Sequence, residues 1–217
     1  MSIDQERVLR RFADAARIAH PALTALDQLA GDGDFGDNLR EGLDWTCAAL
    51  DAAPGEPAIA VAATVFLDRV GGTSGPLLGL LFQELGRALA NTGGGDAPDE
   101  ERARWARGVH EGLAAIQRVG EAEPGDRTMV DALTPARDAL AAGAGFADTA
   151  RAALAGAAAT AQIPARRGRA SYIGDRVIGS PDPGATGVAL LFWALAAVAE
   201  PDSPLGSVTE LVPVPAA

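Results

Sequence analysis

The stretch at 99–119, DEERARWARGVHEGLAAIQRV, has the clearest pattern in this chain of 217 residues. Its large apolar side chains recur every three or four residues, which is the spacing of one helix face: Trp105, Val109, Leu113 and Ile116. Asp96 or Asp99 can cap the start of this helix, because a short acidic side chain accepts hydrogen bonds from free backbone amides. The stretch therefore predicts a long helix with one buried face.

Similar spacing covers most of the remaining chain. It predicts further helices over 3–19, 22–29, 38–52, 57–69, 76–91, 129–142, 147–162 and 185–199. We expect the first to stop before Pro21, because proline lacks the amide hydrogen that a helix interior needs. No segment alternates with the two-residue period of a strand. The sequence therefore predicts an all-α fold, a bundle of helices.

Clusters of glycine, proline and aspartate separate these helices: GDGDFGD, VGGTSGP, NTGGGDAPD, EAEPGD and RRGRASYIGDRVIGSPDPG. In an up-and-down bundle alternate loops lie at the same end, so the loops after 30, 70, 120 and 166 could meet around one ligand. The loop at 92–98 has no obvious phosphate or metal group, and we expect an exposed turn there. A single domain is expected over 1–217, with 200–217 as an extended surface tail.

Composition and charge limit the classes of function. The net charge of −11 disfavours binding to nucleic acid and to anionic membranes, since both need a basic surface. The N-terminus lacks a signal-peptide pattern, and the apolar run at 187–199 is shorter than the roughly 20 residues of a membrane span. We therefore expect a cytoplasmic protein in which the single cysteine, Cys47, is a small buried side chain.

The chain has no lysine, and all 18 of its basic side chains are arginine. A Walker-type phosphate loop, a protein kinase and a Schiff-base enzyme each need a lysine, so these three mechanisms are excluded. The two histidines, His20 and His110, lie outside the glycine-rich motifs. A phosphohistidine step on this chain is therefore not expected.

The stretch at 23–38, LTALDQLAGDGDFGDN, contains three candidate metal ligands: Asp27, Asp32 and Asp34. Carboxylates this close repel one another unless a cation neutralises them, and magnesium prefers oxygen ligands. An EF-hand calcium loop fits poorly, because Gly36 and Leu43 occupy two of its ligand positions. The alternative is an ordinary turn in which Asp37 caps the next helix, and for Asp37 alone we prefer that interpretation.

Three other glycine-containing motifs lie where predicted helices begin. VGGTSGPLLG at 70–79 resembles an anion-binding nest before a helix, although it also fits a plain helix start. GEAEPGDRTMVDALTPA at 120–136 fits a capped helix that carries Thr128, Met129 and Asp131. RRGRASYIGDRVIGSPDPGATG at 166–187 gathers arginines suited to phosphate before a turn at Asp182. For Arg166 and Arg167 a solvated basic loop is the alternative.

These four motifs, in this order, resemble those of the L subunit of dihydroxyacetone kinase, over roughly residues 23–187. The segments typical of that family are GDGDHGTNM, GGTSGPLYG, GDKTMLDAL and GRASYLGERSIGHIDPGA. The corresponding segments here are GDGDFGDNL, GGTSGPLLG, GDRTMVDAL and GRASYIGDRVIGSPDPGA. The resemblance implies a closed barrel of eight antiparallel helices with an ADP or ATP site at one end.

The resemblance also implies the residues of that site. Two magnesium ions would lie between the nucleotide phosphates and three metal ligands: Asp27, Asp32 and Asp34. The phosphates would face Asn38, Thr73 and Ser74. The rest of the nucleotide would be enclosed by Gly120, Met129, Arg169 and the turn formed by Asp182, Pro183 and Gly184. Phe35 stands at the nucleotide where the family usually has histidine, and Asp37 adds a negative charge nearby.

In this family the ketone substrate is held by a separate K-type subunit or domain, so the resemblance implies a K-type subunit as partner. The phosphoryl donor would be ATP or a phosphoprotein of the phosphotransferase system. The function expected first is thus a phosphotransferase subunit acting on dihydroxyacetone or a related hydroxyketone. The alternatives are a kinase subunit for a tetrose or a fatty acid, and a non-catalytic ADP-binding regulatory protein.

Overall fold

The computed structural model describes residues 2–90 and 98–215, and these residues form helices and connecting loops without a strand. The all-α prediction is therefore confirmed. The α-helices are α1 (Gln5–Ala30), α2 (Phe35–Ala52), α3 (Ala58–Arg69), α4 (Ser74–Ala90), α5 (Pro98–Gly120), α6 (Val130–Ala141), α7 (Phe146–Ala159), α8 (Pro183–Ala199) and α9 (Val208–Leu211). The expected cap Asp96 and the expected turn at 92–98, apart from Pro98, lie outside the described residues.

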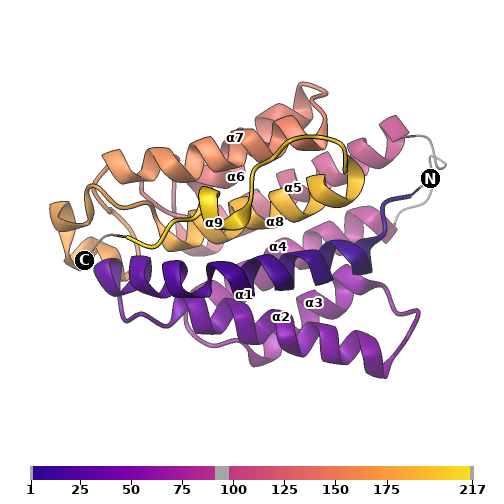
Figure 1. The fold of residues 1–217 in the computed structure, drawn as a ribbon, viewed down its shortest axis with the longest axis horizontal. Helices are drawn as coiled ribbons and strands as arrows, with labels where there is room; N and C mark the ends of the chain where they lie inside the picture. The colour runs from indigo at the N-terminus through magenta and orange to yellow at the C-terminus, as the bar shows by residue number, and fades with distance from the viewer. Residues whose placement is uncertain (1, 91–97, 216–217) are drawn as a thin grey trace.

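The eight long helices form a closed ring. Each helix from α1 to α7 packs against the next one in the chain, and α8 packs against α1 (Figure 1). The large apolar side chains expected on one face of α5 are all in the core: Trp105, Val109, Leu113 and Ile116. The barrel of about eight helices that the family resemblance implies is confirmed.

Helix α8 is the most deeply buried element. Every residue from Pro183 to Ala196 is buried, so this helix is apolar on all sides. It begins at a capped turn, where the Asp182 carboxylate accepts a 2.8 Å hydrogen bond from Ala185 N. The apolar run at 187–199 is thus a core helix, as expected. No helix within the described residues is both long enough and apolar enough to cross a membrane.

The predicted end of the first helix before Pro21 is wrong. Helix α1 runs without interruption from Gln5 to Ala30 and contains Pro21. A proline inside a helix costs about 3 kcal/mol or more, because it removes one hydrogen bond and crowds the preceding turn. The apolar face on both sides of Pro21 is buried, and this burial offsets the cost; it includes Ala19, Ala22, Leu23 and Leu26.

The segment after Glu200 is not extended throughout. It forms α9, whose start is stabilised by a capping box between Ser207 and Glu210. Val208 and Val212 are buried, and Trp193 Nε1 of α8 donates a 3.2 Å hydrogen bond to Gly206 O. This segment therefore packs against the barrel through its own apolar side chains.

Two helical glycines give a test of how closely the helices of the barrel pack. A Cβ atom at Gly156 of α7 would collide with the Asp131 carbonyl oxygen of α6 and would lie 2.7 Å from Pro135 Cγ. We expect Gly156→Ala to lower the free energy of unfolding by about 1–3 kcal/mol, because backbone atoms cannot move aside easily. The measurement is denaturant unfolding followed by circular dichroism.

The matched control is Gly86→Ala in α4, where the nearest heavy atom to an added Cβ is Ala60 N at 3.5 Å. Alanine is about 0.5–1 kcal/mol more favourable than glycine inside a helix, so this variant should be slightly more stable than the wild type. Equal effects of the two substitutions would contradict the close α6–α7 packing.

Candidate functional site

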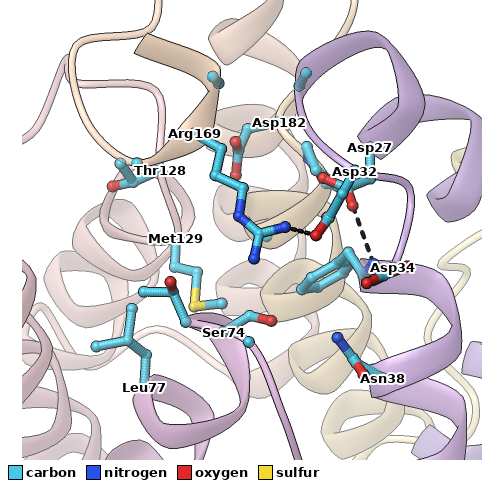
Figure 2. Close-up of a pocket in the computed structure, with 18 of the residues that line it drawn as sticks. Asp27, Asp32, Asp34, Asn38, Ser74, Leu77, Thr128, Met129, Arg169 and Asp182 are labelled. Atoms are coloured by element: carbon cyan, nitrogen blue, oxygen red, sulfur yellow. Dashed lines mark hydrogen bonds and ion pairs between the residues drawn. The ribbon is translucent and has the colours of Figure 1, made fainter. Parts of the chain in front are cut away.

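A cavity of about 360 Å³ lies at one end of the barrel, at the loops α1–α2, α3–α4, α5–α6 and α7–α8. The four loops that the up-and-down topology predicted at one end of the bundle therefore do meet there. Five stretches line the cavity: 27–38, 71–77, 127–129, 167–170 and 182–184. Figure 2 shows side chains from these stretches pointing toward one another across the cavity.

One wall of the cavity carries the three carboxylates expected to bind metal. Asp27 lies in the last turns of α1, and its Oδ2 accepts a 3.0 Å hydrogen bond from Phe35 N, which ties the end of α1 to the start of α2. Between these helices Gly33 has a φ of 85°, a conformation that favours glycine. Asp34 is the N-cap residue of α2, but its side chain makes no capping hydrogen bond. It therefore stays available to a ligand.

Asp32 is paired with an arginine from the opposite side of the cavity. The Arg169 Nη1 atom contacts Asp32 Oδ2, and Figure 2 marks this ion pair. Arg169 belongs to a short 3₁₀ helix, η2 (Arg169–Tyr172). In this structure the guanidinium thus supplies the positive charge next to Asp32.

The donor set of this wall fits magnesium, although its side chains are not gathered into a finished site. Within the described part of the chain, no three acidic, histidine or cysteine side chains are close enough together to hold an ion. The carboxylates of Asp27, Asp32 and Asp34 supply oxygen atoms only, which is what magnesium prefers. Asp27 also lies in the last turn of α1, where the helix dipole favours a cation.

The other walls favour an anion. Helices α2, α4 and α8 begin at the cavity with Phe35, Ser74 and Pro183, so the positive ends of three helix dipoles are directed at it. Thr73 and Ser74 add hydroxyl groups, and Asn38 of α2 lines the same side. Helix starts without acidic side chains in their first turn, such as those of α4 and α8, bind phosphate oxygens readily.

Asp182 lies in the wall formed by the start of α8, where it is 8% exposed. Burial raises the pKa of its carboxyl group to about 6, against the hydrogen bond from Ala185 N and the positive charge of Arg127. The nearest oxygen of Asp182 is 4.0 Å from Arg127 Nη1. Met129 packs close to this turn, since a Cβ at Gly184 would lie 3.0 Å from Met129 Cγ.

The cavity brings together most of the site residues that the sequence predicted. Those that line it are Asp27, Asp32, Asp34, Phe35, Asn38, Thr73, Ser74, Met129, Arg169, Asp182 and Gly184. Gly120 does not line it; it is the last residue of α5, and an added Cβ would find open space there. Leu77, Arg127 and Gly168 also line the cavity and stand inside the quoted motifs, but the sequence did not single them out. Thr128 and Arg167, which the sequence singled out without assigning them to the nucleotide, line it as well.

The interpretation of Asp37 as a helix N-cap is wrong, because α2 begins two residues earlier at Phe35. Asp37 lies in the first turn of α2, where its Oδ1 accepts hydrogen bonds from Arg40 Nη2 at 2.8 Å and His20 Nε2 at 2.9 Å. The hydrogen bond from Arg40, and then that from His20, lower the pKa of Asp37. Its charge is thus held on the outer face of α2.

Comparison with known proteins finds relatives of known chemistry. A family model described as the DAK2 domain matches residues 29–197. The chain is 39% identical over 199 residues to L-erythrulose 1-kinase of Mycolicibacterium smegmatis. The aligned residues make up 87% of this chain and 34% of that protein. The chain is 34% identical over 203 residues to the ADP-binding subunit DhaL of a PEP-dependent dihydroxyacetone kinase of Listeria innocua, covering 90% of this chain and 97% of that subunit.

A solved structure has the same fold. The dihydroxyacetone kinase of C. freundii, crystallised with AMP-PNP and Mg²⁺, superimposes with a TM-score of 0.68 at 26% identity, over 88% of this chain and 33% of that one. This chain therefore spans about a third of the erythrulose kinase and of the solved kinase, but nearly the whole DhaL subunit.

The raised pKa of Asp182 gives a test of its burial. A folded-state pKa of about 6 lies above the ordinary value of 3.8, so the folded protein binds more protons between these values and loses stability as the pH rises through them. Asparagine keeps an oxygen for Ala185 N but does not titrate. We expect the stability advantage of Asp182→Asn over the wild type to grow by up to about 3 kcal/mol from pH 4 to pH 7.

The measurement is urea unfolding of both proteins across this pH range in the presence of EDTA. A stability difference that stays constant with pH would contradict a buried, weakly acidic Asp182.

Proposed function

This chain belongs to the DAK2 domain family, and on that premise we propose that it is the nucleotide- and magnesium-binding subunit of a dihydroxyacetone-type kinase. In this proposal it transfers a phosphoryl group to a short hydroxyketone held by a separate K-type subunit. The observation that carries the proposal is the cavity itself, in which carboxylates at the end of α1 and in the α1–α2 loop share one space with the starts of α2, α4 and α8. A nucleoside diphosphate or triphosphate with magnesium matches both halves of this cavity.

We assign the metal ligands to Asp27, Asp32 and Asp34 and the phosphate contacts to Thr73, Ser74 and Asn38. Bound magnesium, as two ions, would neutralise the negative charge of the transferring phosphoryl group. The helix starts bind the phosphate oxygens through backbone amides, which need no rearrangement as charge develops. No protein nucleophile is required for this transfer, which agrees with the absence of lysine and with histidines placed outside the cavity.

The remaining cavity wall would enclose the nucleoside. Met129 and Gly184 present a close-packed, largely apolar surface, and Asp182 offers a carboxylate oxygen beside it. Arg169 pairs with Asp32 in this structure. Once a cation neutralises Asp32, the guanidinium of Arg169 can form its ion pair with a phosphate instead. We leave Gly120 out of this set because it does not line the cavity.

The DhaL relative supports the proposed partner. That protein is named as a subunit of a PEP-dependent kinase, and this chain covers 97% of it. We propose by analogy a K-type subunit that presents the ketone to the open end of the barrel. ATP that exchanges, and ADP that stays bound while a phosphoprotein recharges it, remain the two candidate donor arrangements.

Erythrulose is the second candidate substrate. The L-erythrulose 1-kinase is 39% identical to this chain, against 34% for the DhaL subunit. Erythrulose is a hydroxyketone with one carbon more than dihydroxyacetone, so the same phosphoryl chemistry serves both. The choice between them would lie with the K-type partner, which holds the ketone.

Nucleotide binding is tested by calorimetry with ADP in magnesium and in EDTA. We expect magnesium to raise the affinity of the wild type, and expect Asp32→Ala combined with Asp34→Ala to reduce this enhancement by at least about tenfold, because two charged ligands are lost. Asp37→Asn is the matched control, since Asp37 pairs with His20 and Arg40 and does not line the cavity. Wild-type protein that binds ADP equally well without magnesium would refute the proposal.

Phosphoryl transfer is tested by reconstitution with a K-type subunit. The assay offers dihydroxyacetone or erythrulose as acceptor, and ATP or a phosphorylated carrier protein as donor. We expect product with at least one pair, and the higher kcat/KM identifies the substrate. A chain that binds magnesium–ADP but gives no turnover with any pair would instead be a non-catalytic ADP-binding protein.

A further inference from the structure

Arg127 is a buried cation that the proposed function does not use. Its side chain has no exposed surface, yet the residue lines the nucleotide cavity between the α5–α6 loop and the start of α8. Its φ is 62°, the left-handed conformation that is costly for a residue with a side chain. Both the burial of a guanidinium and this backbone conformation cost free energy, so the surrounding structure must hold Arg127 in place.

Arg127 is bonded to only one side of its surroundings. Its Nη2 donates to Ser180 O at 2.9 Å and to Val177 O at 3.4 Å. Its Nε and Nη1 are buried and have no hydrogen-bond partner among the described residues. The closest carboxylate oxygen to Nη1 is Asp182 Oδ1 at 4.0 Å, which is too long for a hydrogen bond. A buried charged donor left unpaired is destabilising.

The carbonyls that Arg127 binds belong to the segment at 166–182, which carries Arg169 and Asp182. This segment has only 3₁₀ turns, η2 (Arg169–Tyr172) and η3 (Gly174–Val177), and its apolar support is a small cluster of Ala30, Ala165, Ala170 and Val177. Short 3₁₀ turns and a small cluster stabilise a segment weakly. Backbone hydrogen bonds at Arg166, Gly179 and Asp182 tie this segment to neighbouring residues. The two bonds from Arg127 add a link from the α5–α6 loop to the end of η3 and to the part of the segment between η3 and α8.

One carboxylate oxygen of Asp182 is available to Arg127. Its Oδ2 accepts the capping hydrogen bond from Ala185 N, whereas none of the hydrogen bonds among the described residues reaches Oδ1. A ligand in the cavity would cover the part of the Asp182 side chain that is still exposed, and a lower local dielectric strengthens the attraction between opposite charges. A shift of about 1 Å would bring Nη1 and Oδ1 into hydrogen-bond range.

We propose that Arg127 is a positioning residue, which holds the segment at 166–182 against the cavity and closes its ion pair with Asp182 when magnesium–nucleotide binds. This inference rests on the proposed nucleotide site. Part of the nucleotide affinity then comes from an Arg127–Asp182 attraction that is weak in the free protein. Such a gain is measurable, because it makes the effects of the two side chains on affinity depend on each other.

The test is a double-mutant cycle on the affinity for magnesium–ADP at pH 8, with Arg127→Met, Asp182→Asn and the double variant. We expect each single substitution to weaken binding about 10- to 30-fold, the range for losing a buried charge-assisted hydrogen bond. The double variant should bind within about threefold of the weaker single variant, whereas independent effects would multiply to more than 100-fold. Multiplying losses, or wild-type affinity in Arg127→Met, would overturn the proposal.

Arg127→Lys and Arg118→Met complete the design. Lysine keeps the charge but cannot contact Ser180, Val177 and Asp182 together, so the affinity of Arg127→Lys for magnesium–ADP should lie between those of the wild type and Arg127→Met. If Arg127→Met does not fold, Arg127→Lys takes its place in the cycle. Arg118 is exposed on α5 and outside the cavity, so Arg118→Met should bind like the wild type. Wild-type protein that fails to bind magnesium–ADP would refute the proposed function, whereas wild-type binding with multiplying losses refutes only the role of Arg127.

Discussion

The contact between α8 and α1 is the constraint on which the rest of the structure depends. It closes the ring of helices and places the carboxyl end of α1 next to the start of α8. Because successive helices run in opposite directions, the starts of α2, α4 and α6 then lie at the same end. A fully buried α8 makes this closure possible, since a helix that is apolar on every side is stable only when it is covered. The site is therefore a consequence of how the chain closes on itself.

The cavity is lined both by groups that attract cations and by groups that attract anions. The end of α1 and three carboxylates attract cations, whereas three helix starts attract anions within the same small space. A magnesium–phosphate ligand satisfies both sets of groups, while either ion alone would leave one set unpaired. In this structure Arg169 compensates the carboxylates through Asp32, and Arg127 faces Asp182 without reaching it. On a chain with a net charge of −11, these two arginines are important for keeping the cavity acceptable to a phosphate.

Local patterns predicted the fold class and the shared end of the loops, but not the features that depend on packing between helices. The face of α5 with Trp105 was predictable because it needs only the spacing of apolar residues. The continuation of α1 through Pro21 was not, because burial on both sides outweighs a local rule. Gly120 and Arg127 flank the same loop, and the sequence did not reveal that its backbone turns Arg127 inward and leaves Gly120 outside. The positive φ of Arg127 is a tertiary property, and its only sequence signal was a cation inside the GDRTM motif.

Phe35 illustrates why a changed side chain need not change a site. The family resemblance places a histidine here, and phenylalanine removes its polar group. Phe35 is 6% exposed, and its ring belongs to the hydrophobic core, packed so closely on α8 that a Cβ at Gly187 would lie 2.7 Å from Phe35 Cζ. The link between this position and the carboxylate wall is the backbone N–H, which donates to Asp27 Oδ2 at 3.0 Å. Since any residue other than proline supplies that N–H, the hold on Asp27 is independent of the side chain. The substitution therefore leaves the proposed metal wall intact and alters only the surface that a ligand meets beside it.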